Sequence, residues 1–76
     1  MTIHDLKNGD HFLFKGDELS NRLCRYFIFC RMELLISRDG IMQFAVHCII
    51  KHADGKTSLW CNASWNMTTT NVQLLP

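Results

Sequence analysis

The chain has 76 residues, a length that allows one domain, 1–76, with a single hydrophobic core. Hydrophobic residues make up 47% of the sequence and charged residues 20%, a globular composition that argues against an intrinsically disordered chain. Eight Lys and Arg residues against seven Asp and Glu residues give a net charge of +1. This balance is typical neither of a strongly basic nucleic-acid binder nor of an acidic DNA mimic.

Turn signals divide the chain into five predicted strands. Asp39-Gly40 and Asp54-Gly55 each lie between apolar runs, which is a strong signal for a β-hairpin. A short helical turn over 17–24 is predicted between the first two strands, with Asp17 as its N-cap. In chain order, the strands are expected near residues 10–15, 25–37, 41–51, 57–64 and 71–75.

The alternation of apolar and polar residues predicts the register of both hairpins. In the first, a three-residue loop (38–40) with Gly40 left-handed places Cys30 opposite Cys48. In the second, a two-residue Asp54-Gly55 loop places Cys61 opposite Cys48. The same registers pair Leu34 with Phe44, Met32 with Val46, Ile28 with Ile50 and Val46 with Ala63.

These registers place Cys30, Cys48 and Cys61 in one row across three adjacent strands. Neighbouring strands lie ~4.8 Å apart, so the outer two cysteines would be ~10 Å apart. Four thiolates on one zinc ion must lie within about 4 Å of each other, and the sequence has no Cys-x-x-Cys pair. We therefore interpret the row as buried free thiols of the core and expect no metal site. A zinc site and a disulfide are the alternatives.

The opposite face of the same three strands carries the candidate binding patch. One row holds Phe29, Ile49 and Trp60, and the next holds Arg31, His47 and Asn62. A half-solvated sheet normally shows polar residues on this face, and an exposed apolar patch with a polar rim marks a binding site. Two alternatives stay open. In the first, this face is covered, either by the first strand with Phe12 and Phe14 or by the segment 17–24. In the second, the long second strand switches faces midway.

No constellation of residues predicts catalysis or a cofactor. His47 points away from its neighbour Cys48 in a strand, so the two cannot form a nucleophilic Cys–His pair. Glu33 is the only acidic residue well inside a predicted strand, whereas acid–base hydrolysis usually needs two carboxylates. The sequence also lacks the motifs of phosphate loops, nucleophile elbows and zinc hydrolases. We therefore expect a protein that is not an enzyme.

The two ends of the chain carry a resemblance to a known fold. Asp5-Leu6-x-x-Gly9-Asp10-x-Phe12 leads into the first strand, and Val72-x-Leu74-Leu75-Pro76 forms the last. With two hairpins between them, these segments look like an SH3-like small β-barrel. The resemblance implies an all-β fold with five antiparallel strands in a small barrel. It also implies a binding module, because such barrels bind peptides, proteins and nucleic acids.

The start of the chain, Met1 to Asp5, lacks the basic and apolar regions of a signal peptide, and no apolar stretch is long enough to span a bilayer. A cytoplasmic protein with free thiols and no membrane partner is therefore expected. The leading hypothesis is a protein-interaction module that acts as an adaptor, regulator or inhibitor of a larger protein, similar in size to accessory proteins of bacteria and phages. The second is a nucleic-acid-binding barrel, with a homodimer pooling basic residues, and the third is a small zinc-binding protein.

Overall fold

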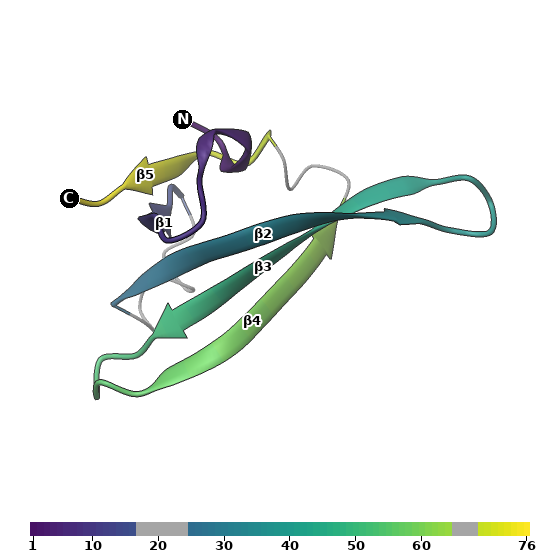
Figure 1. Ribbon diagram of the computed structural model, residues 1–76. Helices are drawn as coiled ribbons and strands as arrows, with labels where there is room; N and C mark the ends of the chain where they lie inside the picture. Colours follow the sequence, from purple (N-terminus) through teal and green to yellow (C-terminus); the bar gives the residue numbers. More distant parts are fainter. Residues whose placement is uncertain (17–24, 65–68) are drawn as a thin grey trace.

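Five antiparallel strands form one sheet in the order β4-β3-β2-β1-β5 (Figure 1). The computed structural model describes residues 1–16, 25–64 and 69–76. The strands are β1 (His11–Phe14), β2 (Tyr26–Ile36), β3 (Met42–Lys51), β4 (Thr57–Ser64) and β5 (Val72–Leu74), preceded by the short 3-10 helix η1 (Ile3–Asp5). The all-β class and all five predicted strands are confirmed. The helical turn predicted for 17–24 lies outside the described residues.

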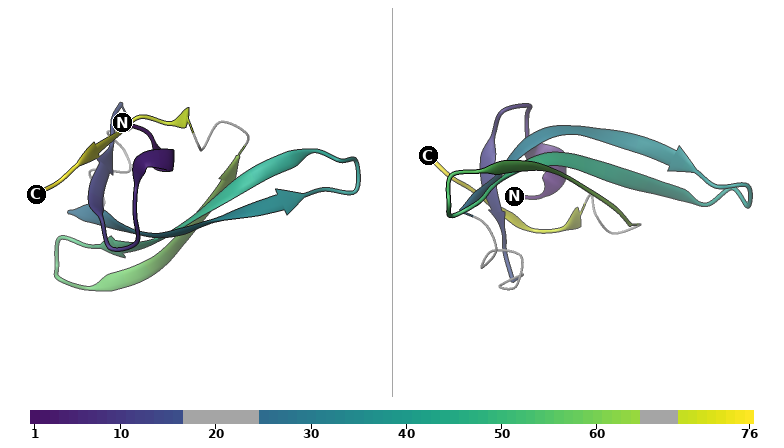
Figure 2. Two further views of the ribbon diagram at one scale, coloured as in Figure 1. Left: turned by 45° about the horizontal axis from the view of Figure 1, so that its top comes forward. Right: turned by 90° about the horizontal axis from the view of Figure 1, so that it is seen from below.

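The sheet is open, which corrects the expectation of a closed small barrel. The outer strands β4 and β5 are not paired with each other in the part of the chain that the structure describes. Instead, β1 and β5 cross over one end of the longer β2–β3–β4 ribbon (Figure 2). No described residue belongs to a helix that is long and apolar enough to cross a membrane.

The amino-terminal motif folds back onto the sheet and joins its core. The Thr2 N–H donates a 2.8 Å hydrogen bond to the Asp5 carboxylate across η1, and Ile3 is fully buried. Gly9 has a φ of +93°, which a residue with a Cβ rarely adopts, and its N–H donates to the Phe29 carbonyl at 2.8 Å. This turn brings β1 alongside the first part of β2.

The core lies between β1, β5 and η1 on one side and one face of the β2–β3–β4 ribbon on the other. We call that face the packed face. Its centre is aromatic: the rings of Phe12, Phe14 and Phe27 lie between 4.9 and 5.5 Å apart, centroid to centroid. Trp60 of β4 lies 5.6 Å from Phe14 and 5.4 Å from Phe27. The buried cluster consists of Ile3, Leu6, Phe12, Phe14, Phe27, Phe29, Val46, Cys48 and Val72.

The first hairpin turns as predicted. The Ser37 N–H donates to the Ile41 carbonyl at 2.9 Å across the three-residue loop 38–40, and Gly40 is left-handed with a φ of +77°. The predicted pairs Leu34–Phe44 and Met32–Val46 are confirmed.

Further along the same hairpin, a β-bulge overturns the predicted pairs Cys30–Cys48 and Ile28–Ile50. The register shifts between Phe29 and Arg31, so Cys48 lies opposite Phe29 and Ile50 opposite Phe27. Residues 26–30 are apolar without alternation, so the sequence pattern fits either phase. The bulge turns the two phenylalanines inward, and their rings bury more apolar surface than Ile28 and Cys30 would.

The second hairpin has a three-residue loop, and the predicted two-residue loop is wrong. The His52 N–H donates to the Lys56 carbonyl at 2.8 Å, and Gly55 is left-handed with a φ of +90°. This is the geometry of the first hairpin repeated. Trp60, rather than Cys61, therefore lies opposite Cys48 and contributes its large ring to the core. Likewise Asn62, rather than Ala63, lies opposite Val46.

The far half of the β2–β3 hairpin, residues 31–44, projects from the body of the molecule (Figure 1). We call it the hairpin arm. It accounts for the elongated shape of the protein, which measures 41 × 23 × 23 Å. Large apolar side chains are exposed on it: Leu34, Leu35, Ile36, Ile41 and Met42.

Candidate functional site

The structure divides the predicted binding patch between the two faces of the ribbon. Phe29 is 6% exposed on the packed face, and Trp60 also lies there, against Phe14. The expectation that these two aromatics share an exposed surface with Ile49 is therefore wrong. The two alternatives that stood open each describe one of these residues. Trp60 is covered by β1 through Phe14, and β2 changes face at the bulge that follows Phe29, between Phe29 and Arg31. Asn62 lies opposite Val46, on the packed side, and is exposed.

The other three predicted residues, Arg31, His47 and Ile49, lie together on the opposite side, which we call the outer face. The register shifts bring new partners to them there. An apolar row runs across the strands as Ile28, Ile49 and Leu59. A polar row beside it runs as Arg31, His47 and Cys61. An apolar row next to a cation and an imidazole is thus present: Arg31, His47 and Ile49 are the predicted residues, whereas Ile28, Leu59 and Cys61 replace Phe29, Trp60 and Asn62.

The apolar row opens toward the sheet edge. Ile28 and Ile49 are half-buried between their neighbours on the face, whereas Leu59 on β4 exposes 88% of its surface. β4 is an edge strand with a neighbour on one side only, so nothing among the described residues shields this side chain. The row therefore offers apolar surface that increases toward β4.

The polar row is organised around the imidazole of His47. Its Nε2 lies 3.3 Å from Glu33 Oε1 and 4.0 Å from Cys61 Sγ. The other carboxylate oxygen of Glu33 lies 3.7 Å from a guanidinium nitrogen of Arg31. Exposed ion pairs of this kind contribute only about 0–1 kcal/mol to stability. Their main effect is to hold side chains of both signs at fixed places beside the apolar row.

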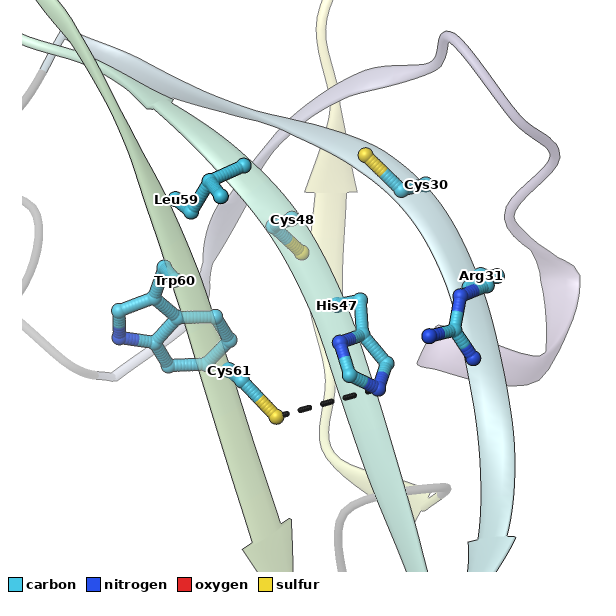
Figure 3. A pocket seen from close by; sticks show the side chains of 7 residues that line it. All are labelled: Cys30, Arg31, His47, Cys48, Leu59, Trp60 and Cys61. Atoms are coloured by element: carbon cyan, nitrogen blue, oxygen red, sulfur yellow. Dashed lines mark hydrogen bonds between the residues drawn. The ribbon is translucent and has the colours of Figure 1, made fainter.

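A hollow of about 420 Å³ lies beside the polar row and is bordered by Leu59 of the apolar row (Figure 3). In Figure 3, Leu59 and Cys61 stand on one side of it, His47 in the middle and Arg31 on the other side. Its complete lining is Cys30, Arg31, His47, Cys48, Leu59, Trp60 and Cys61. A hollow of this size has room for a side chain or a small group of a partner.

The close approach of Cys61 to His47 does not form a catalytic triad. In a triad the base uses one ring nitrogen for the nucleophile and the other for the orienting carboxylate. Here Glu33 and Cys61 both approach the same atom, Nε2 of His47. That nitrogen cannot accept the thiol proton while it donates to the carboxylate, so the three side chains are not arranged as a triad.

Sequence reasoning tested His47 against Cys48 and missed Cys61 as its neighbour. The missing signal was the turn: a three-residue loop at Asp54-Gly55, like that at Asp39-Gly40, pairs His47 directly with Cys61. The interpretation of Cys30, Cys48 and Cys61 as three core thiols is also wrong: the turn places Cys61 on the outer face, and the β-bulge displaces Cys30 from the position opposite Cys48. Cys48 is buried, Cys30 is half-buried at the bulge and Cys61 is exposed, all three as free thiols. Within the described ranges, no group of three or more His, Cys, Asp and Glu side chains could hold a metal ion.

Burial gives Cys48 a measurable pH signature. Loss of hydration raises the pKa of this thiol from 9.0 to about 12, and the nearby Cys30 adds to the effect. Above about pH 9 the unfolded chain releases this proton while the folded chain retains it, so the free energy of unfolding falls as pH rises toward 12. We expect Cys48→Ala to lose this part of the pH dependence in urea titrations from about pH 8 to about pH 11. If the free energy of unfolding of Cys48→Ala depended on pH as steeply as that of wild type, the thiol would be exposed to water in the folded protein.

The outer face thus joins an exposed leucine, two isoleucines, a hollow and a rim that carries charges of both signs. Apolar patches rimmed by polar groups mark interaction sites on soluble proteins. Comparisons of the chain with protein-family models, with curated proteins and with solved structures find no match, so the site is interpreted from its own residues.

Proposed function

We propose that this chain is a non-enzymatic protein-interaction module that docks on a larger protein through its outer face. The observation that carries the proposal is the apolar row, in which Leu59 exposes 88% of its surface beside Ile49. Fully burying a leucine side chain stabilises a structure by about 1.5–3 kcal/mol. In the isolated chain the Leu59 side chain stays in water, and a partner surface that buries it would gain this stabilisation.

The surroundings of the row suit a specific interface. The hollow beside Leu59 receives an apolar side chain of the partner, and such filled pockets at the centre of an interface carry most of its binding energy. Arg31, Glu33 and His47 form a rim that offers both donors and acceptors. The rim fixes the orientation of the partner, while the row and the hollow supply affinity.

The proposed role is that of an adaptor, regulator or inhibitor in the cytoplasm, in the manner of small accessory proteins of bacteria and phages. The strand order supports it, because β1 lies between β5 and β2, as in the SH3-like small barrels that the chain resembles. Nucleic acid fits the outer face less well. Its guanidinium at Arg31 is already paired with Glu33, and phosphate binding needs an excess of positive charge.

Affinity capture from a host lysate tests the proposal, with Leu59→Ser compared with wild type. Leu74→Ser on β5 is the matched control, since Leu74 is also exposed, at 45%, but lies far from the row in the strand order. We expect one protein to be retained by wild type and by the control, to be lost with Leu59→Ser, and to resist nuclease treatment. The retained protein and the purified chain should then form a complex when mixed.

Two results would overturn the proposal. Equal retention by all three chains would show that the row does not bind the partner. Retention that disappears with nuclease would assign the outer face to a nucleic acid instead.

A further inference from the structure

One edge of the hairpin arm has no backbone partner among the described residues. β1 accompanies β2 only as far as Phe29, whose N–H donates to the Asp10 carbonyl at 2.9 Å. The Asn8 side chain then donates to the Cys30 carbonyl at 3.0 Å and ends the contact. From Arg31 to Ile36, β2 is paired with β3 on one side and open on the other.

The backbone groups that point to this open edge can be identified. Alternate residues of an antiparallel strand direct their N–H and C=O groups to opposite sides. The Ser37 N–H donates to Ile41 on β3, so the groups of Ser37 point inward. The pairing from Arg31 to Ile36 has no irregularity, so the N–H and C=O groups of Met32, Leu34 and Ile36 point outward.

The open edge lacks the features that normally prevent strands from pairing. Proteins protect exposed edges with Lys, Pro or bulges, and residues 32–36 contain none of them. Glu33 is the only charged residue in this segment, and Leu34, Leu35 and Ile36 expose 48%, 40% and 65% of their surfaces. The edge is therefore suited to accept another strand.

We propose that a second copy of this chain pairs with the arm, β2 against β2, as a two-fold antiparallel dimer with Leu34 on the axis. Met32 of each copy then lies opposite Ile36 of the other, and all three outward-pointing residues of both copies exchange backbone hydrogen bonds. Glu33 lies opposite Leu35, so no like charges meet. With Glu33 on the axis, two carboxylates would face each other, and with Leu35 on the axis the groups of Met32 would stay unpaired.

Three further features favour a second copy as the occupant. In this register the pairing ends with Ser37 of one copy opposite Arg31 of the other. The next residue of β2, Cys30, already has its carbonyl bonded to the Asn8 side chain, so the paired segment fits the length of the open edge. The net charge of +1 gives two copies little reason to repel. The exposed side chains of Leu34, Leu35 and Ile36 lie on β2 itself, so pairing of the two edges brings the apolar side chains of both copies side by side. This surface is separate from the apolar row of the outer face, and the dimer does not depend on the proposed function.

Sedimentation of the purified full chain at micromolar concentrations tests the dimer. We expect the molar mass measured for wild type to be twice the 8.9 kDa mass of the chain. Leu34→Pro removes only an outward N–H, so the variant should keep its far-UV circular dichroism and sediment as a monomer. Leu59→Pro is the matched control on the other open edge: Lys56 pairs inward with His52, so the N–H of Leu59 also points outward. This control should remain dimeric.

A charge exchange at Leu34 tests the axis without proline. Leu34→Lys and Leu34→Glu should each weaken self-association about tenfold or more, because like charges meet on the axis. Their mixture should restore the dimer. A monomeric wild type, a dimeric Leu34→Pro, loss of the dimer in Leu59→Pro only, or no recovery in the mixture would each overturn the proposal.

Discussion

Phe27→Ala is expected to lower the free energy of unfolding by about 3–5 kcal/mol. Phe27 is 1% exposed, and its ring touches those of Phe12, Phe14 and Trp60. Its removal leaves a cavity at the junction of β1, β2 and β4 that rigid neighbouring rings cannot fill. A domain of this size has a total stability of roughly 4–11 kcal/mol, so the substitution removes a substantial part of it. Urea titration followed by circular dichroism measures the loss.

Ile28→Ala is the control for this substitution, and the comparison tests the bulge. Ile28 is half-buried on the outer face, so its truncation should cost less than half as much as that of Phe27. Without the bulge, as the sequence pattern predicted, Ile28 would face the core and Phe27 would not. A larger loss for Ile28→Ala than for Phe27→Ala would therefore contradict the structure.

Trp60→Ala should cost about 2–4 kcal/mol, near the range for a buried aromatic residue. Its indole packs on Phe14 and Phe27 at centroid distances of 5.6 and 5.4 Å, and part of it remains accessible. Leu59→Ala, one residue earlier in the same strand, should change the stability by less than about 0.5 kcal/mol, because Leu59 is 88% exposed. Circular dichroism is the suitable probe, since the substitution removes a tryptophan.

The two neighbours respond oppositely because successive residues of a strand face opposite sides of the sheet. A one-residue register error would exchange their roles. If Leu59→Ala were the destabilising substitution and Trp60→Ala were neutral, the second hairpin would have the two-residue loop, and the binding patch would again contain Trp60.

The positions of the strands could be predicted because their signals are local. Each Asp-Gly pair lies between two apolar runs, and the alternation in residues 42–50 is regular enough to define a half-buried strand. The first loop length followed from the pairing of Leu34 with Phe44, since only a three-residue loop places both on one face. These features depend on neighbours in sequence and need no knowledge of the core.

The two register errors arose where the local signal allows two answers. Residues 26–30 are apolar on both faces, so alternation does not locate the bulge at Cys30. Asp54-Gly55 fits a two-residue loop as well as the end of a three-residue loop. Packing decides both cases, because the observed registers bring Phe27 and Trp60 to the aromatic centre.

The two register errors changed which residues form the outer face, but the outer face still carries an apolar row beside a polar row. Arg31, His47 and Ile49 were predicted for the outer face and lie there. Leu59 and Cys61 were missed because the register error assigned the whole of β4 to the wrong face. A period of two residues makes such an error complete, since one step reverses every side chain of a strand.

Nuclear Overhauser effects between Hα atoms of β3 and β4 test the outer face most directly. In antiparallel strands, the Hα atoms come closest in pairs that are not hydrogen-bonded. The account predicts strong effects between His47 and Cys61 and between Ile49 and Leu59, the pairs that build the two rows. Strong effects between Cys48 and Cys61 instead would contradict it, because they would turn Leu59 inward and remove the apolar row from the surface.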